Sequence, residues 1–378
     1  MNPFRTGQRV TGEFFTDRAE EVARIVRAMR DPSRLLVYGP RRVGKSSAIA
    51  MAAERVRQDG GLVVEADLST ASTVTDVTNR LLTSLHRAGR GPRPSLLDFL
   101  GNLRLRFDVD QASGTPSVAL ESRERASPPE RQAGTLESVL DRIDALASDS
   151  DAPVSVVLDE FQEVVSLGPD RADWWLRSVM QRHEHVSYVC AGSRKALIDR
   201  MIGKEGPFFG GFERIWVGPV DPGHLSRWID SRMEGAGVPA LGCGRAVIAA
   251  VGPRLEDVMN LARQTYYIAA ARGRYEPEDP GRALDEIVRA DEAAFHALWD
   301  GLTALQQNVL RAVAAGEEAL HAAATRERYA LGPSSSVTVA VRSLVDREIV
   351  VREAGAVAFD NPFFRCWVRA MPLEDIGR

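Results

Sequence analysis

The segment from Gly39 to Ser46 constrains the fold of this chain more than any other feature. It reads Gly-Pro-Arg-Arg-Val-Gly-Lys-Ser and fits the phosphate-loop pattern G-x-x-x-x-G-K-[ST]. An apolar run at 35–38 precedes it, and a helix-like stretch at 47–53 follows it. In this strand–loop–helix setting the glycines let the backbone wrap closely around a phosphate. The loop N–H groups and the positive end of the helix then face the anion.

Two side chains of this loop have distinct expected roles. Lys45 reaches the outer phosphates, and the Ser46 hydroxyl holds Mg²⁺. Lysine occurs elsewhere only at Lys195 and Lys204, so a chain that otherwise prefers arginine has kept lysine at this position. The residues expected to bind the nucleotide, ATP or ADP, are Gly39, Pro40, Arg41, Arg42, Val43, Gly44, Lys45, Ser46 and Ser47.

A second constraint comes from the apolar, β-branched run at 154–158, which predicts a buried parallel strand. The run ends in Asp159 and Glu160. Aspartate at such a strand tip can support Mg²⁺ through its hydration shell, and the adjacent glutamate can polarise the water that attacks a phosphoryl group. The sequence lacks the base-reading Asn/Thr-Lys-x-Asp segment of a GTPase, and a small-molecule kinase needs no such glutamate. The pair therefore favours ATP hydrolysis over two merely solvated carboxylates.

Composition bounds the setting of this site. The 378 residues are enough for two or three domains, and the net charge of −4 gives no global attraction to nucleic acid or acidic membranes. The three cysteines, Cys190, Cys243 and Cys366, lie too far apart to suggest a disulfide framework or a zinc site. No apolar run nears the roughly 18 residues that span a bilayer. We therefore expect a cytoplasmic protein with no membrane partner.

Strand-like and helix-like patterns alternate through the first 220 residues. The strand-like runs lie at 35–38, 62–67, 154–158, 186–190 and 215–217, and helical patterns lie at 19–30, 74–86, 135–146 and 172–181. This alternation predicts an α/β fold with a parallel sheet. Ligands of such sheets bind outside the carboxyl ends of the strands, where the phosphate loop, Asp159-Glu160 and Ser193 all fall. We expect Trp174 and Trp175 in the last helix to be core residues.

Residues 89–134 differ from their surroundings because they are rich in Arg, Pro, Ser and Gly. Alternating runs at 103–109 and 117–120 around a turn predict a β-hairpin insertion with mobile flanks. A partner contact and a solvated excursion are both compatible with this composition.

From Asp221 onward strand signals vanish. Helical patterns, including 246–251 and 255–271, run to Arg274, and a polar linker follows at 275–280. Helices are predicted at 303–314, 320–329 and 333–345, followed by a hairpin of 349–352 and 356–359, which together make a winged helix-turn-helix. We therefore predict three domains: a P-loop core at 1–220, a helical lid at 221–290 and a winged helix at 291–378.

The chain resembles the archaeal-type P-loop ATPases, AAA+-related ATPases near the origin-recognition initiators and the signalling NTPases with numerous domains. The segments that carry the resemblance are Asn2-Pro3-Phe4, Phe15-x-Asp17-Arg18, the phosphate loop, Leu158-Asp159-Glu160-Phe161-Gln162 and Asp360-Asn361-Pro362-Phe363-Phe364-Arg365-x-Trp367. Asn361, interposed before Pro362, is a small departure. The resemblance implies a five-stranded sheet of order 5-1-4-3-2, a helical lid, a winged helix and ATP as ligand.

The resemblance also implies roles for residues outside the two motifs. Ser193 falls where relatives place a γ-phosphate sensor, with a helix cap as the alternative. Gln162 either couples to that sensing or sits exposed on a helix. Arg214, just before the fifth strand, matches an arginine that enters a neighbouring subunit's site. Arg254 matches the place in the lid where relatives carry a second arginine or a proline-centred sensor. Surface positions are the alternatives for both. Phe4, Phe15 and Arg18 are expected on the adenine side.

His183 and His185 are predicted to lie in a polar loop, not to bind metal.

The predicted winged helix poses the question of its partner. Its recognition helix offers Ser334, Ser335, Ser336, Thr338 and Arg342, which suit phosphate and guanine contacts. Residues 291–378, however, hold nine arginines and twelve acidic residues, a net charge of −3. DNA affinity usually rests on a basic face, here only a local stripe of Arg342, Arg347 and Arg352. Double-stranded DNA and a protein partner stay open.

The function predicted from sequence is a Mg²⁺-dependent ATPase switch. ATP closes the lid on the sheet domain, and hydrolysis releases it and moves the winged helix. A DNA-tethered regulator that hydrolyses ATP only when assembled, as in a homo-oligomer, is one alternative. A nucleotide-dependent interaction scaffold with little turnover is the other, and the Asp159-Glu160 pair argues against it.

Overall fold

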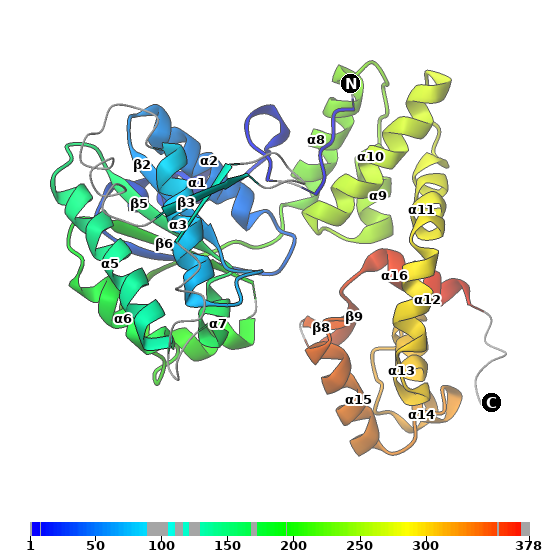
Figure 1. The fold of residues 1–378 in the computed structure, drawn as a ribbon. Helices are drawn as coiled ribbons and strands as arrows, with labels where there is room; N and C mark the ends of the chain where they lie inside the picture. Colours follow the sequence, from blue (N-terminus) through cyan, green and yellow to red (C-terminus); the bar gives the residue numbers. More distant parts are fainter. Residues whose placement is uncertain are drawn as a thin grey trace. The chain divides into compact units, whose positions relative to one another are not determined.

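The computed structural model describes residues 2–7, 9–88, 105–109, 116–120, 129–167, 172–193, 195–353 and 355–371. It divides the chain into two compact units. Unit 2 is Gly7–Val220, and unit 1 joins the N-terminal Met1–Thr6 to Asp221–Arg378. Figure 1 labels most elements of both units.

Unit 2 is built on a parallel five-stranded sheet. Its strands are β1 (Arg34–Tyr38), β2 (Leu62–Asp67), β5 (Val154–Asp159), β6 (Ser187–Gly192) and β7 (Glu213–Trp216). They lie in the order β2-β5-β6-β1-β7, and every neighbouring pair is parallel. Counted along the chain this order is 2-3-4-1-5, which is the predicted 5-1-4-3-2 order seen from the other edge. The predicted fold class is confirmed.

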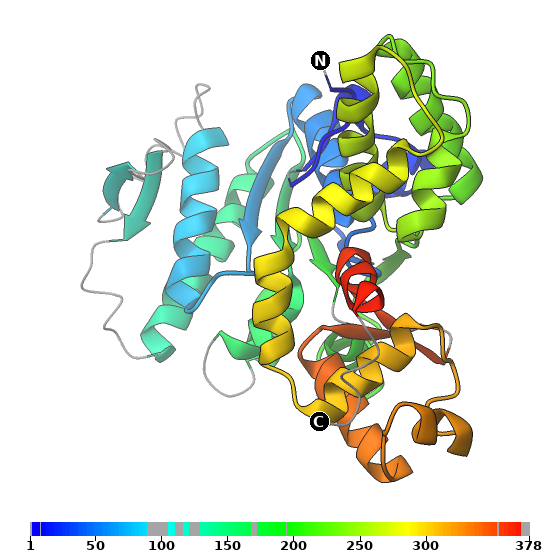
Figure 2. The same ribbon diagram turned by 90° about the vertical axis from the view of Figure 1, so that its right-hand side faces the viewer.

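Helices cover both faces of this sheet, because side chains of each strand alternate between two apolar layers. On β1, Leu35 and Val37 pack with helices α1 (Ala19–Arg30) and α2 (Lys45–Gln58). Leu36, between them, packs in the opposite layer with α3 (Val74–Ala88), α5 (Pro129–Ser148), α6 (Ala172–Arg182) and α7 (Lys195–Ile202). Figure 2 shows the sheet between these two helical layers.

The predicted β-hairpin insertion is confirmed where the structure describes it. Strands β3 (Leu105–Val109) and β4 (Pro116–Leu120) pair antiparallel, with Leu105 opposite Leu120. Positions 89–104, 110–115 and 121–128 of the predicted insertion lie outside the described residues. Positions 129–134 belong to α5, which begins at Pro129 and not at 135 as expected. Two short 3₁₀ helices, η1 (Gly12–Phe14) and η2 (Phe161–Ser166), complete unit 2.

The first part of unit 1 is helical, with α8 (Pro222–Gly235), α9 (Cys243–Val251), α10 (Leu255–Arg272), α11 (Asp279–Ala290) and α12 (Glu292–Asp300). The predicted linker at 275–280 is too long, because α11 begins at the fully buried Asp279 and has Pro280 in its first turn, where proline is tolerated. The N-terminal residues pack here as well. The Phe4 ring meets Trp228 edge-on at 6.0 Å, and the Asn2 amide donates to the Arg263 carbonyl at 3.0 Å.

The second part of unit 1 is the predicted winged helix. It comprises α13 (Ala304–Ala314), α14 (Ala323–Arg328), α15 (Ser334–Asp346), the antiparallel pair β8 (Val350–Glu353) and β9 (Ala356–Phe359), and α16 (Pro362–Ala370). Asn361, the departure noted above, caps α16 by accepting from the Phe363 and Phe364 amides at 2.8 and 3.1 Å. In the part of the chain that the structure describes, no helix is both long enough and apolar enough to cross a membrane.

Candidate functional site

The phosphate loop leaves the carboxyl end of β1 and enters α2 at Lys45. A Cβ atom on Gly39 would lie 2.0 Å from the Val217 carbonyl oxygen, so only glycine fits beside the segment that follows β7. Arg42 and Gly44 both have positive φ, at 62° and 93°. Positive φ values inside a turn let successive N–H groups face one concave side, which is the geometry that binds anions. The loop therefore has the backbone that a phosphate site requires.

Lys45 is held inside this loop. Its side chain is buried, and Nζ donates to the carbonyl oxygens of Gly39, at 3.1 Å, and of Pro40. Burial lowers the pKa of Lys45 to about 8, although the nearby Glu160 and Asp159 carboxylates oppose the shift. An ammonium that is poorly solvated and close to the loop carbonyls gains from a phosphate counter-charge.

Arg18 supports the loop from within the protein. It is buried with a left-handed backbone at φ 67°. Its Nη2 donates to the carbonyl oxygens of Val43, at 2.8 Å, and of Gly218, and Nη1 pairs with Glu21 at 3.2 Å. Phe15 is partly buried against the α1–α2 core layer. Adenine contacts by Phe15 and Arg18 stay predictions, whereas Phe4 belongs to the other unit, where it is buried.

The two residues predicted to hold Mg²⁺ are brought together. Asp159, at the end of β5, is buried and makes a side-chain hydrogen bond with Ser46 at the start of α2. Its Oδ1 accepts from the Glu160 amide at 3.0 Å, and its Oδ2 lies 3.1 Å from Nη2 of Arg9. Burial raises the pKa of Asp159, and the Ser46 and Arg9 contacts oppose that rise. A hydroxyl and a carboxylate are the oxygen ligands that Mg²⁺ prefers, so these residues fit the ion.

Glu160 is fixed by a small polar network. Its backbone is left-handed at φ 51°, and its Oε2 accepts from Ser193 Oγ at 3.0 Å and from Gln162 Nε2. Gln162 is 1% exposed, so the alternative that placed it on an exposed helix face is wrong. A Cβ atom on Gly192 would lie 2.7 Å from Gln162 Oε1, so the glycine before Ser193 makes room for this network.

The two arginines that the resemblance singled out lie in different units. Arg214 lies inside β7, opposite Leu36 of β1, and not before the strand as expected, because β7 begins earlier, at Glu213. Its exposed side chain donates to the Ile202 carbonyl at 3.1 Å. Arg254, in unit 1, pairs with Asp360 Oδ1 at 2.8 Å and donates to the Phe359 carbonyl at 2.8 Å. Nucleotide contacts by either arginine stay predictions.

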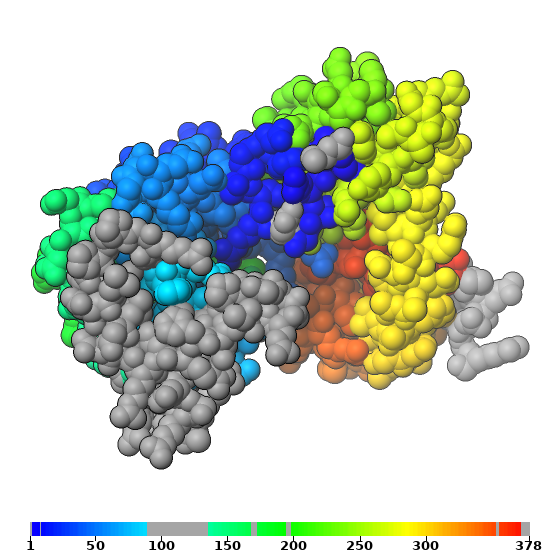
Figure 3. Space-filling model, turned by 45° about the horizontal axis from the view of Figure 1, so that its top comes forward, coloured from blue at the N-terminus to red at the C-terminus, as the bar shows by residue number. Residues whose placement is uncertain are grey.

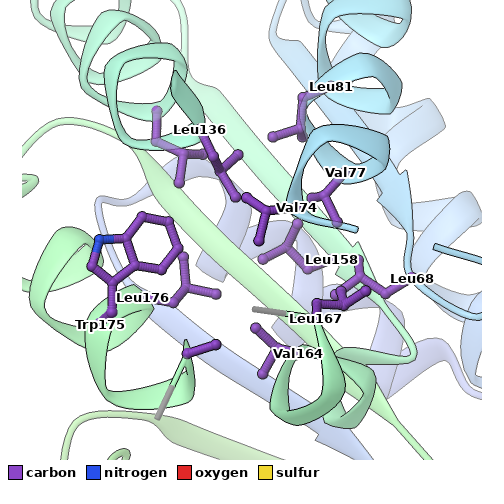
Figure 4. A pocket seen from close by; sticks show the side chains of 12 residues that line it. Leu68, Val74, Val77, Leu81, Leu136, Leu158, Val164, Leu167, Trp175 and Leu176 are labelled. Atoms are coloured by element: carbon purple, nitrogen blue, oxygen red, sulfur yellow. The ribbon is translucent and has the colours of Figure 1, made fainter. Parts of the chain in front are cut away.

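Two aromatic positions differ from expectation. Trp174 and Trp175, in the first turn of α6, are only partly buried, and Trp175 packs against the apolar core. Trp175 lines a small apolar cavity of about 20 Å³ between α3, α5, α6 and η2, shown in Figure 4. This cavity is far too small for a nucleotide. His183 lies in the predicted loop, between α6 and β6, and is buried there, with Nδ1 2.6 Å from the Tyr188 hydroxyl and Nε2 2.8 Å from Asp141.

The outer face of α15 is the other candidate surface. Ser334, Ser335, Thr338 and Arg342 are exposed, whereas Ser336 is partly buried. Val339, on the same face, is 68% exposed. Of the predicted basic stripe, Arg347 donates to the Gly301 carbonyl at 3.0 Å, and Arg352 is exposed.

Comparisons with known proteins agree with this fold. A family model described as a probable winged helix domain matches residues 293–370. The Walker-type ATPase PABY2304 of Pyrococcus abyssi superposes with a TM-score of 0.66 at 16% identity, over 97% of this chain and 99% of that one. The chain has the Walker-type ATPase fold. None of the curated proteins matched its sequence.

Two further solved structures have the same fold. The ORC2 protein of Aeropyrum pernix, in ADPNP–ADP complexes, gives a TM-score of 0.59 at 15% identity, covering 92% of this chain and 91% of that one. The ORC1 protein of A. pernix, in complex with DNA, gives 0.50 at 16% identity with the same coverage. Identities this low establish the fold and not the activity.

The sequence missed two contributors to the site. Arg9 and Glu65 lie in no motif, and only the folded chain brings Arg9 to Asp159 and Glu65. Gln162 was singled out in sequence, but its buried bond to Glu160 required the structure.

Proposed function

We propose that this protein is a Mg²⁺-dependent ATPase that acts as a molecular switch. The observation that carries the proposal is the meeting of Ser46, Asp159, Glu160 and Ser193, from the ends of three neighbouring strands, beside a loop with phosphate-binding geometry. Groups that can hold the metal ion, activate the attacking water and bind the phosphates then lie in one place.

Each chain residue has one task in this proposal. The loop N–H groups and Lys45 bind the β- and γ-phosphates, and Ser46 and Asp159 would hold Mg²⁺. Mg²⁺, when bound, neutralises phosphate charge. Glu160 orients the attacking water and accepts its proton. Ser193 and Gln162 position the Glu160 carboxylate, since both donate to its Oε2.

The switch part of the proposal concerns the predicted domains 1–220, 221–290 and 291–378. Arg254 of the lid and Arg214 of a second copy in a homo-oligomer are the proposed further contacts to the nucleotide. Phe15 and Arg18 complete the adenine side, and Arg41 and Arg42 contact phosphate. These contacts would come from both sides of a hinge. Nucleotide exchange or hydrolysis therefore changes the position of the lid and the winged helix relative to the core.

The partner of the switch is proposed from the α15 surface. One solved relative is in complex with DNA, and hydroxyl and guanidinium groups on α15 suit a duplex. The exposed Val339 and the net charge of −3 over residues 291–378 favour the second candidate, an ATP-dependent scaffold that turns over little and uses this surface for protein contacts.

Steady-state ATP hydrolysis with Mg²⁺, with and without double-stranded DNA, tests both candidates. The Glu160→Gln protein is the blank, because it keeps the site and loses the base. Turnover above this blank supports the ATPase, and stimulation by DNA assigns the partner. Turnover equal to the blank in both conditions, with nucleotide still bound, supports the scaffold.

A further inference from the structure

Arg9 is a cation already placed on the carboxylate that we assign to Mg²⁺. Its Nη2 lies 3.1 Å from Asp159 Oδ2, and its Nη1 lies 2.8 Å from Glu65 Oε2. The Asp159 side chain is 9% exposed, whereas Arg9 is 38% exposed. A buried carboxylate without a counter-charge is costly, so a ligand-free site gains from this guanidinium.

The backbone beside Arg9 is fastened to the helix that follows the phosphate loop. The Val10 amide donates to Ser47 Oγ at 3.2 Å, and the Gly12 amide contacts Met51 Sδ at 3.3 Å. Both acceptors lie on α2, so Arg9 is presented to Asp159 from the same element that carries Lys45 and Ser46. Figure 3 shows the N-terminal residues, in dark blue, on the face of the molecule that it draws. The Arg9 side chain is partly exposed, so it can leave Asp159 without unfolding the core.

Glu65 does not depend on Arg9 for its charge balance. Its Oε1 pairs with Arg57 of α2 as well. Among the described contacts, therefore, release of Arg9 leaves Glu65 with an arginine partner and removes the only arginine paired with Asp159. Release of Arg9 therefore leaves Asp159, the proposed metal ligand, without its arginine partner.

We propose that Arg9 is an internal counter-cation of Asp159 that Mg²⁺ displaces when nucleotide binds. This inference rests on the proposed function. Two cations compete for one carboxylate, so Arg9 sets the Mg²⁺ concentration at which the site fills.

Arg9 lies close in the chain to residues that belong to the other unit, so its displacement by Mg²⁺ also affects the covalent connection between the units. Residues 2–6 belong to unit 1, where Asn2 donates to Arg263 and Arg263 donates to Thr6 at 3.1 Å. Only positions 7 and 8 separate this anchored segment from Arg9, and Gly7 has a φ of 72°, which glycine adopts at no cost. Release of Arg9 therefore loosens one of the two chain connections between the units.

The test is a Mg²⁺ titration of fluorescent ATP-analogue binding to wild type, Arg9→Gln and Arg57→Gln. Arg57→Gln is the matched control, because it removes an arginine from Glu65 and leaves the Arg9–Asp159 pair intact. We expect Arg9→Gln to lower the Mg²⁺ midpoint by about two- to fivefold, the range of a part-exposed ion pair. At saturating Mg²⁺ the affinity of Arg9→Gln for the ATP analogue should match that of wild type. Arg57→Gln should leave the Mg²⁺ midpoint unchanged.

Three results would overturn the inference: an unchanged midpoint in Arg9→Gln, a raised midpoint, or a loss of affinity at saturating Mg²⁺, which would make Arg9 a nucleotide ligand. Hydrogen exchange of the 9–15 peptide is the second readout. Mg²⁺ and nucleotide should speed its exchange in wild type, and Arg9→Gln should be fast without ligand. If wild type shows no Mg²⁺-dependent nucleotide binding at all, the proposed function fails, which is a separate outcome.

Discussion

Replacing Lys45 by methionine should stabilise the ligand-free protein while abolishing nucleotide binding. The reason lies in its burial. Desolvation lowers the pKa of Lys45 from 10.5 to about 8, so the folded state binds its proton less well than the unfolded chain does. The charged lysine therefore opposes folding at neutral pH. Its benefit to the protein is the proposed binding of the nucleotide phosphates.

The magnitude follows from proton linkage. A shift of this size corresponds to about 3 kcal/mol of destabilisation at pH 7, which falls to about 1.4 kcal/mol at pH 9.5 as the folded-state lysine loses its proton. Methionine removes this penalty but also the hydrogen bonds to Gly39 and Pro40, at about 1 kcal/mol each. The variant should be more stable than wild type by about 1 kcal/mol at pH 7, or roughly 2 to 4 °C.

The assay is thermal denaturation of the ligand-free protein, followed by circular dichroism at pH 7 and pH 9.5. Wild type should gain stability relative to Lys45→Met by about 2 kcal/mol over this range, so that the order of the two proteins reverses. Lys204→Met, at an exposed lysine, is the control and should show neither effect. A Lys45→Met protein that is less stable at pH 7, or a stability difference independent of pH, would refute the reasoning.

Three further predictions address the polar network around Glu160 and the role of Arg214. Glu160→Gln should bind ATP with wild-type affinity and lower kcat at least about 100-fold; retained hydrolysis in single-turnover assays would remove Glu160 as the base. Gly192→Ala should lower kcat about tenfold with little change in nucleotide affinity, because its Cβ would press on Gln162 and Ile198; an unchanged kcat would show that the network does not position Glu160. Arg214→Ala should lower the activity of wild type in subunit-mixing experiments if it acts on a neighbouring copy, whereas activity that simply averages the two proteins would exclude that role.

Much of the architecture was predictable because it rests on local patterns. The phosphate-loop spacing, the β-branched run before Asp159 and the α/β alternation predicted a parallel sheet with its ligand site at the carboxyl ends of the strands, and the family resemblance added the strand order. The sheet and winged helix are confirmed. Two boundaries were misplaced. The exposed Glu213 and Arg214 belong to β7 because they pair with β1, and the 275–280 linker is cut short because α11 begins at the buried Asp279.

The sequence by itself determined the phosphate loop, the acidic pair at the end of β5 and the order of elements, because these depend on residues close together in the chain. Only the tertiary structure decided which side chains share a hydrogen bond across long separations. Arg9 reaches Asp159 over 150 positions, and Ser193 reaches Glu160 over 33. Such pairs carry no periodicity and no spacing rule, since their distance is set by how strands and loops pack and not by the residues between them.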